Sequence, residues 1–259
     1  MKNSLILISV LFVFSSCDFF HKKAKEEVAG KEDKVVNTSN SKGKNGTEKY
    51  YFGTGELKSI VHYKDNKKVG ISETFYQSGE KQYDIPYVDG MKQGAVKWYY
   101  KDGKVYRETT YFKGKKDGIQ KKFWENGHLK SELYYEKDML SRDLKEYTKS
   151  GKEKTVPSIK VEKIDLLKSS EEYVLRFRLS NGRKNVQFYQ GNLIEGKFFP
   201  SKGTKGFVVL KTVGGVGELR VRVPKGFNVN KKIPIVAVEK TAYQNDRLLS
   251  TVVPLVIQN

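Results

Sequence analysis

Glycine recurs every 24 residues between positions 55 and 151, and this period constrains the fold more than any other feature of the sequence. An aromatic pair precedes each of the first four glycines, as Phe123-Trp124 precedes Gly127, and a tyrosine follows eight residues after it. Self-similarity at a fixed period indicates a repeat protein, in which each unit buries its apolar face only against its neighbours. The glycines are Gly55, Gly79, Gly103, Gly127 and Gly151, and the tyrosines are Tyr63, Tyr87, Tyr111 and Tyr135.

Each unit has the pattern of two short strands and two turns. Asp102-Gly103 and Asn126-Gly127 are strong hairpin signals, because such turns need a positive φ. A second turn is expected ten and eleven residues after each glycine. One hairpin is marginal alone, so we expect the units to continue as one antiparallel sheet with ladders of tyrosine. The fifth unit carries Arg142 in a glycine position and Thr148 in an aromatic position, which is typical of a terminal capping unit.

The unit, an aromatic pair, two residues, glycine, then tyrosine, a turn and a second glycine, resembles the MORN-type repeat in its bacterial variant form. The resemblance covers about residues 49–154. It implies an extended sheet of β-hairpins that serves in protein–protein or membrane association. Bacterial proteins with this variant are often described as antitoxin-like. Where MORN repeats accompany an enzyme, the resemblance places the chemistry in a separate domain.

The N-terminus has the layout of a secretory signal. Lys2 precedes an apolar run at residues 5–14 that is too short to span a bilayer stably. Cys17 is the only cysteine, so no intrachain disulfide can form. Residues 14–17 read Phe-Ser-Ser-Cys and resemble the bacterial lipoprotein signal, in which the cysteine is acylated; the alternative is a plain signal with an incidental thiol. We therefore predict a lipoprotein signal over 1–17, lipidation of Cys17 and a membrane-anchored place in the bacterial cell envelope.

Three further segments follow in the predicted domain order. Residues 18–48 contain too few apolar side chains to offset the entropy of ordering them, which predicts a disordered tether. The repeats occupy 49–156. Residues 157–259 alternate apolar and polar side chains in about seven short runs, which predicts a β-sandwich of immunoglobulin-like type, with a small closed barrel as the alternative. The predicted fold class is all-β: an extended antiparallel sheet of repeated hairpins followed by a small sandwich.

The net charge of +19 is spread over both predicted folded parts and favours polyanionic partners. No zinc-finger or helix-turn-helix pattern accompanies it, so a nucleic-acid partner is not expected. Lys68, Lys92 and Lys116 share one register, and stacked repeats would align them as a stripe able to hold a lipid headgroup, an acidic glycan or an acidic protein. The alternative is a solvated turn edge. Four arginines at 176, 178, 220 and 222 would form an anion-binding face only if their strands share a sheet.

Catalytic chemistry is not indicated. His62 and His128 occupy different repeat columns, and no Cys/His cluster or nucleophile motif is present in the sequence. Trp124, Glu125 and His128 lie together as a sugar-binding wall would, but the repeat register explains Trp124 as scaffold. We expect no cofactor, no metal and a non-enzymatic, lipid-anchored interaction scaffold with an unidentified protein partner. The alternatives are an antitoxin- or immunity-type partner of a toxin and an envelope glycan-binding module.

Overall fold

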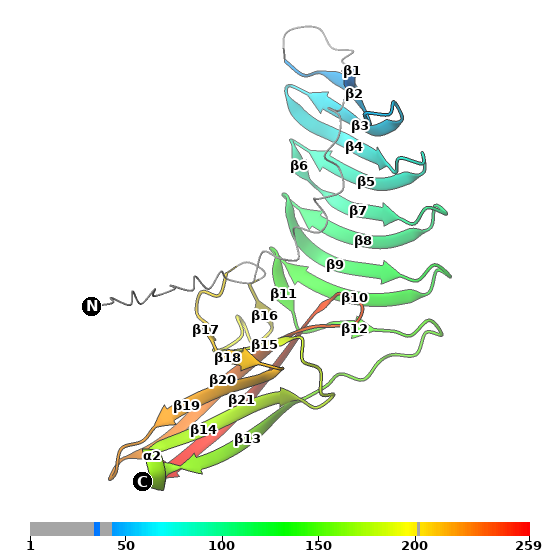
Figure 1. Cartoon of the computed structure of the whole chain (residues 1–259). Coiled ribbons are helices and arrows are strands. Elements are labelled where there is room, and N and C mark those ends of the chain that lie inside the picture. Colours follow the sequence, from blue (N-terminus) through cyan, green and yellow to red (C-terminus); the bar gives the residue numbers. More distant parts are fainter. Residues whose placement is uncertain (1–33, 37–42, 201–202) are drawn as a thin grey trace, which may run out of the picture.

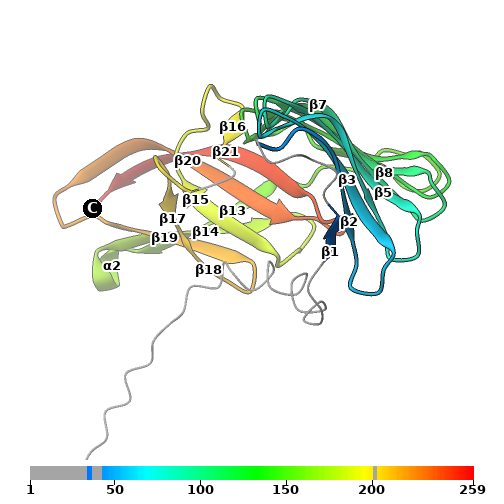
Figure 2. The ribbon, with the colours of Figure 1, turned by 90° about the horizontal axis from the view of Figure 1, so that it is seen from above.

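The computed structural model describes residues 34–36, 43–200 and 203–259. The predicted signal, Cys17 and most of the predicted tether lie outside this part of the chain. The described residues form a tall sheet of stacked hairpins and a sandwich docked against its lower end (Figure 1). Seen from above, the sandwich extends to one side of the stack rather than continuing its axis (Figure 2). The all-β prediction is confirmed.

The repeat sheet has 13 strands among the described residues, all joined by antiparallel pairing. It begins before residue 49: β2 starts at Gly46 and pairs with β1, so part of the segment predicted to be a tether belongs to the sheet. Its strands are β1 (Lys34–Val36), β2 (Gly46–Tyr51), β3 (Leu57–Lys64), β4 (Lys67–Phe75), β5 (Lys81–Val88), β6 (Met91–Lys92), β7 (Gly94–Tyr99), β8 (Val105–Phe112), β9 (Lys115–Phe123), β10 (Leu129–Glu136), β11 (Met139–Ser141), β12 (Lys145–Glu146) and β16 (Phe198–Phe199).

Two turns per unit explain the period of the sequence. In the first turn, the Gly103 amide donates to the Tyr100 carbonyl at 3.0 Å, and the Tyr100 amide donates to the Lys104 carbonyl at 2.8 Å. The same pair of bonds recurs at Gly55, Gly79, Gly127 and Gly151, each with positive φ. The glycines predicted to make turns therefore do so, including the one in the fifth unit.

The second turn ties each unit to the one before it. The Gly90 amide donates to the Lys68 carbonyl, and the Gly114 amide donates to the Lys92 carbonyl, both at 2.9 Å. Asp89 and Gly90 both have positive φ, as the hairpin signal requires. The backbone carbonyls of Lys68 and Lys92 thus accept the hydrogen bonds that connect neighbouring units.

One face of the sheet, here the inner face, carries a row of buried cross-strand pairs. These include Val96 opposite Thr109 and Gln120 opposite Leu133. The outer face instead alternates charges across neighbouring strands, with Glu108 opposite both Lys97 and Lys121. The two faces follow from the period of two of a β-strand, and the inner face supplies Leu133 and Tyr135 to the core shared with the sandwich.

The sandwich consists of two four-stranded sheets, ordered β13-β14-β19-β18 and β17-β15-β20-β21. Lettered by sequence, these orders are A-B-E-D and C′-C-F-G, the immunoglobulin arrangement. The apolar run at residues 206–213 forms two strands instead of one. It divides at buried Leu210, so that β17 joins one sheet and β18 the other. The elements are β13 (Ile159–Leu166), α2 (Leu167–Ser170), β14 (Glu172–Leu179), β15 (Val186–Gln190), β17 (Val208–Val209), β18 (Lys211–Val213), β19 (Val216–Arg222), β20 (Asn228–Lys240) and β21 (Asp246–Gln258).

The sandwich has an apolar core between its two sheets, and a separate apolar core joins the sandwich to the repeat sheet. Leu133 and Tyr135 of β10 pack with Phe199, Val236 and Leu248 of the sandwich side. β16, which lies in the chain of the sandwich, pairs with β11 and so extends the repeat sheet. The docking is therefore made by both side chains and backbone.

A buried ion network lies beside this core. Arg247 donates from its two terminal nitrogens to Glu146 at 2.9 Å and to Glu239 at 3.2 Å. Nearby, the Lys122 ammonium donates to the carbonyls of Tyr243 and Gln244 at 3.2 and 3.1 Å. Buried charges need such partners, so the network fixes how the two parts meet.

Candidate functional site

The lysine stripe predicted from the sequence exists, but its side chains lie over aromatic rings. The ammonium nitrogens of Lys68 and Lys92 lie 5.2 Å from the ring centres of Tyr87 and Tyr111, and that of Lys116 lies 4.6 Å from Tyr135. A fourth member, Lys44, lies 4.9 Å from the ring of Tyr63. The sequence interpretation missed Lys44 because it placed that residue in the tether. The 24-residue offset between Lys44 and Lys68 is the signal that would have identified it.

Lysine and tyrosine alternate along this edge of the inner face. Lys68 lies opposite Tyr63 in the strand register while its ammonium reaches the next tyrosine, Tyr87. Burial raises the pKa of Tyr87 and raises that of Tyr135 to about 12, so the rings stay neutral and present their faces to cations. Burial also lowers the pKa of Lys116. The stripe is therefore part of the packing of the sheet rather than a row of free cations.

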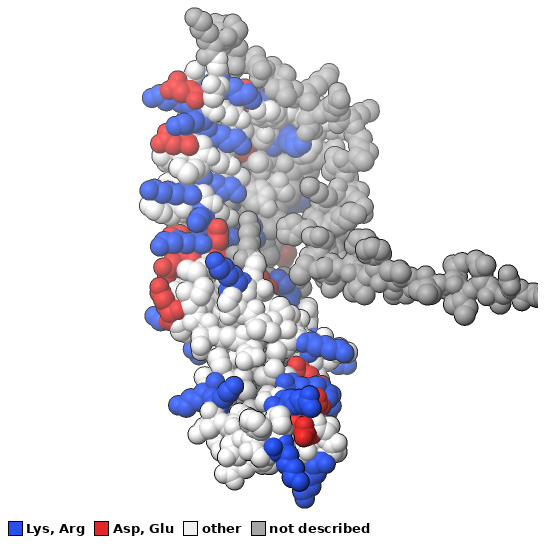
Figure 3. All heavy atoms as spheres, turned by 90° about the vertical axis from the view of Figure 1, so that its left-hand side faces the viewer, with Lys and Arg blue, Asp and Glu red and all other residues white. Residues whose placement is uncertain are grey.

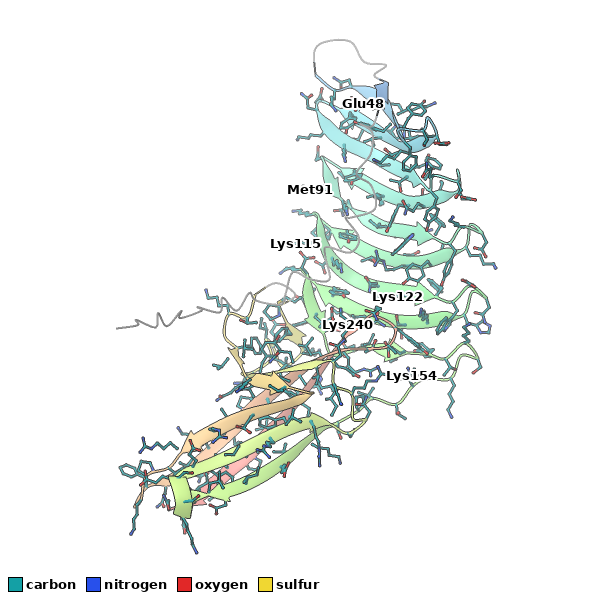
Figure 4. The ribbon with its side chains drawn as sticks, viewed as in Figure 1. Glu48, Met91, Lys115, Lys122, Lys154 and Lys240 are labelled. Carbon is teal, nitrogen blue, oxygen red and sulfur yellow. The ribbon has the colours of Figure 1, made fainter. Side chains whose placement is uncertain are left out.

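The second turns form an exposed edge of different character, here called the turn rim (residues 64–68, 88–92, 112–116 and 136–140). Val88, Met91 and Phe112 are 54%, 44% and 50% exposed, high values for large apolar side chains. The rim carries eight lysines against four acidic residues. Figure 3 shows basic side chains in blue, interleaved with acidic ones in red, along this edge, and Figure 4 places Met91 and Lys115 on it.

The first turns, at the opposite ends of the strands, carry a cleft of about 410 Å³. It lies between the third, fourth and fifth units, beside the sandwich. Its lining combines three aromatic rings, two lysines, a carboxylate and an amide: Tyr100, Tyr106, Trp124, Glu125, Asn126, Lys130 and Lys149.

Hydrogen bonds between units hold the cleft residues in place. Trp124 donates from its indole nitrogen to the Tyr147 carbonyl at 3.3 Å, as Tyr100 donates its hydroxyl to the Phe123 carbonyl at 2.8 Å. Trp124 is thus scaffold, as its register predicted, and it also lines the cleft.

The loop of the fifth turn is attached to the fourth. The carbonyl of Lys149 accepts from the Asn126 amide at 3.2 Å and lies 3.0 Å from His128 Nδ1. His128 therefore positions Lys149 and is not itself a cleft residue, whereas Glu125 is.

The four arginines of the sandwich do share a sheet, because β14 pairs with β19. Three of them face glutamates. Arg176 and Arg220 both contact Glu218, at 3.0 and 2.8 Å, and Arg222 contacts Glu171 at 3.3 Å. This face is already largely neutralised and is a weak candidate for binding an anion.

Neither a metal centre nor a spanning helix is found in the described residues. No group of three or more His, Cys, Asp or Glu there is arranged to hold a metal ion. Of the helices in that same part of the chain, none is long and apolar enough to cross a membrane. The candidate binding features of the described surface are therefore the turn rim and the cleft.

The repeats match a known family model. Four tandem segments, residues 44–65, 68–89, 92–113 and 116–137, match the MORN repeat variant. This part of the chain is an array of MORN repeats. Each matched segment begins at a lysine of the stripe and ends in a second turn. The first turn of the fifth unit, at Gly151, lies beyond the last match. The MORN repeat is generally a binding module, and no curated protein matches the chain.

Proposed function

We propose that this protein is a non-enzymatic, lipid-anchored interaction scaffold of a bacterial envelope whose turn rim lies against an anionic membrane surface. The observation that carries the proposal is the rim, where Val88, Met91 and Phe112 protrude among lysines. The array of four MORN repeats supports a binding role for this sheet. The sequence around Cys17 supports an acyl anchor.

The rim has the chemistry of a peripheral membrane contact. Apolar side chains on turns can enter the boundary between headgroups and acyl chains without exposing paired backbone groups. Each lysine near an anionic surface contributes about 1 kcal/mol. A single acyl chain binds membranes only marginally, so a basic, apolar edge would add the second signal that stable attachment needs.

Vesicle flotation tests the rim apart from the anchor. In a Cys17→Ser background, full-length protein should float with vesicles of phosphatidylglycerol and phosphatidylcholine but not with phosphatidylcholine alone. Met91→Ser with Phe112→Ser should weaken flotation at least about tenfold, since the two exposed apolar side chains that would enter the membrane are lost. The matched control is Val209→Ser with Val213→Ser, which removes exposed apolar side chains from the sandwich (54% and 67% exposed). Equal loss in both double variants, or no flotation of the parent, would contradict the membrane role of the rim.

The anchor has its own test. Wild-type protein expressed in a bacterial host should incorporate an alkyne-tagged palmitate and remain with the membranes, whereas Cys17→Ser should lose the label. Labelling of the Cys17→Ser variant would show that this cysteine is not the acylation site.

A further inference from the structure

The cleft between the third and fifth units differs from the grooves of the other repeats in its composition. The ring centres of Tyr100 and Tyr106 lie 5.1 Å apart at 69°, which makes a corner of two aromatic walls. Trp124 lies against Tyr243 of the sandwich in a T-shaped pair at 5.1 Å. Within the described residues, the groove beside Tyr50 and Lys58 is lined by repeat residues alone, whereas a lining residue of this cleft contacts the sandwich.

Two lysines of the cleft lie near the ring of Trp124, and one of them, Lys130, also lies 6.0 Å from the centre of the Tyr106 ring. The ammonium of Lys130 lies 4.3 Å from the centre of the Trp124 ring and 5.3 Å from that of Tyr243. The ammonium of Lys149 lies 5.6 Å from the Trp124 ring. Among the ion pairs of the described residues, neither lysine has a carboxylate partner. Burial lowers the pKa of Lys130, the effect of a cation held in a partly dry site, with Glu146 acting in the opposite direction. An incoming carboxylate would supply the missing charge.

The remaining lining narrows the class of ligand. Glu125 accepts hydrogen bonds only, so it suits a hydroxyl group. The Asn126 side chain already donates to the Lys149 carbonyl and accepts from the His128 amide at 3.1 Å, which leaves one N–H and one oxygen lone pair for a ligand. The Glu125 charge also opposes a ligand with closely spaced negative charges. Aromatic ring faces carry partial negative charge and attract the C–H groups of a sugar ring. A volume of about 410 Å³ falls within the usual range for small-molecule sites.

We propose that this cleft binds a pyranose that carries a carboxylate, the acidic residue of a glycan. The sugar ring lies against Tyr100 and Tyr106, its carboxylate pairs with Lys130 and Lys149, and its hydroxyls bond to Glu125 and Asn126. The first turns and the turn rim lie at opposite ends of the strands, so a sheet resting on a membrane by its rim would turn this cleft away from the bilayer (Figure 4). The glycan site does not depend on membrane binding, and either proposal can fail alone.

Calorimetric titration of the full-length protein in detergent tests the site with three probes: tetragalacturonate, the neutral maltotetraose and tetraglutamate. Tetragalacturonate should bind, and the other two should bind at least tenfold more weakly. Lys149→Ala should lower the affinity for tetragalacturonate about tenfold, the usual cost of a lost charged hydrogen bond. Lys130→Gln should do the same, because it removes the ammonium group. Glutamine already occupies this repeat position two units earlier, at Gln82.

The chain offers a matched control for Lys149. Lys101 holds the position of Lys149 two repeats earlier, and its ammonium lies 5.7 Å from the ring of Tyr76, as that of Lys149 lies 5.6 Å from the ring of Trp124. Lys101 does not line the cleft. Lys101→Ala should leave the affinity unchanged. An equal loss in Lys101→Ala would reduce the site to general basic charge. Equal binding of tetraglutamate would make it a site for acidic peptides, and equal binding of maltotetraose would remove the role of the carboxylate. Absence of tetragalacturonate binding would overturn the proposal while leaving the vesicle result untouched.

Discussion

The repeat sheet and the sandwich bury their apolar residues in different ways. In the sandwich, Leu175, Phe177, Phe188 and Ile235 are fully buried between two sheets. In the first three repeats, the buried inner row mixes apolar residues such as Val61 with polar ones such as Ser72. The sandwich is therefore stabilised mainly by a closed core, and the upper repeats mainly by bonds and ring contacts between neighbouring units.

One position of the repeat shows where packing within the array gives way to docking against the sandwich. Positions 24 residues apart on the inner face hold Tyr50, Thr74 and Trp98 in the upper units, then Lys122 and Glu146. The last two are buried and contact the sandwich turn at residues 241–247. A column that serves packing within the array thus changes to polar docking at its end, which is how a repeat array acquires a specific neighbour.

Truncation of a core ring should give the largest contrast between the two regions. Phe188→Ala removes a fully buried ring that packs over Gly217, where even a Cβ would come within 2.7 Å of it. We expect a loss of about 3–5 kcal/mol in the free energy of unfolding. Tyr87→Ala, which removes a half-buried ladder tyrosine, should cost about 1 kcal/mol through its cross-strand contacts. Chemical denaturation followed by circular dichroism measures both. Similar losses would contradict the difference between the closed core and the single-layer array.

Removal of the buried arginine should come next in size. Arg247→Met leaves Glu146 and Glu239 buried without their shared cation, and breaking such a pair costs about 3–5 kcal/mol. Because the network joins the two parts, we also expect thermal unfolding to separate into two transitions. Differential scanning calorimetry checks this.

The control for Arg247 lies on the exposed face of the sandwich. Arg220→Met removes two solvent-screened ion pairs with partly exposed glutamates and should lower the free energy of unfolding far less than Arg247→Met does. A single sharp transition in Arg247→Met, equal to that of Arg220→Met, would show that the apolar core alone couples the two parts.

Local pattern was enough to predict most of the fold. The turn glycines needed only a period and the positive φ of a hairpin, so Gly55 to Gly127 were correctly placed. The alternation after residue 157 predicted the sandwich, because strands on either side of one core keep a period of two. The predicted start of the sheet at residue 49 was wrong, because the strands that cap the array, β1 and the first part of β2, lie in a segment whose low apolar content resembles that of a tether.

The candidate site was harder to predict, since its defining contacts are long-range. Lys130 lies in a column that holds Gln82 and Tyr106 in earlier units, and nothing local shows that Tyr243 approaches it. Likewise, the partners of Lys122 are more than 100 residues away along the chain. Register predicts which residues share a face of the array, but it does not predict what docks on that face.

The dependence of stability on pH sharpens the comparison at the docking surface. Burial lowers the pKa of Lys122 to about 8 from 10.5, so between these values the unfolded chain holds a proton that the folded one has lost. Stability should therefore rise with pH across this window, by about 1–3 kcal/mol. Lys122→Met should lose most of the rise, and what remains comes from Lys116 and Lys130, whose pKa values burial also lowers. Denaturation midpoints measured from pH 7 to pH 9.5 test this.

Tyrosine ionisation sets the upper pH limit of this experiment. Burial and Asp84 raise the pKa of Tyr99 to about 12, so above about pH 10 the unfolded chain loses a tyrosine proton that the folded one keeps, and stability falls. Both proteins should show that fall. Lys97→Met, on the outer face, is the control and should keep the rise below pH 10. A parallel profile for Lys122→Met and wild type would show that Lys122 is not the source of the dependence.

The smallest expected effect tests whether single bonds between units hold the array together. Tyr100→Phe removes the hydroxyl that donates to the Phe123 carbonyl, and we expect a loss of about 0.5–1.5 kcal/mol. Tyr76→Phe should cost more, because the Tyr76 hydroxyl donates to the Tyr99 carbonyl and also accepts from the Trp98 indole at 3.0 Å. Tyr134→Phe is the control, since that hydroxyl has no hydrogen bond among the described residues. Hydrogen exchange of the third and fourth units reports the change locally. If all three variants exchanged alike, ring contacts and backbone pairing would be the source of the array's stability, and the hydroxyl bonds would contribute nothing measurable.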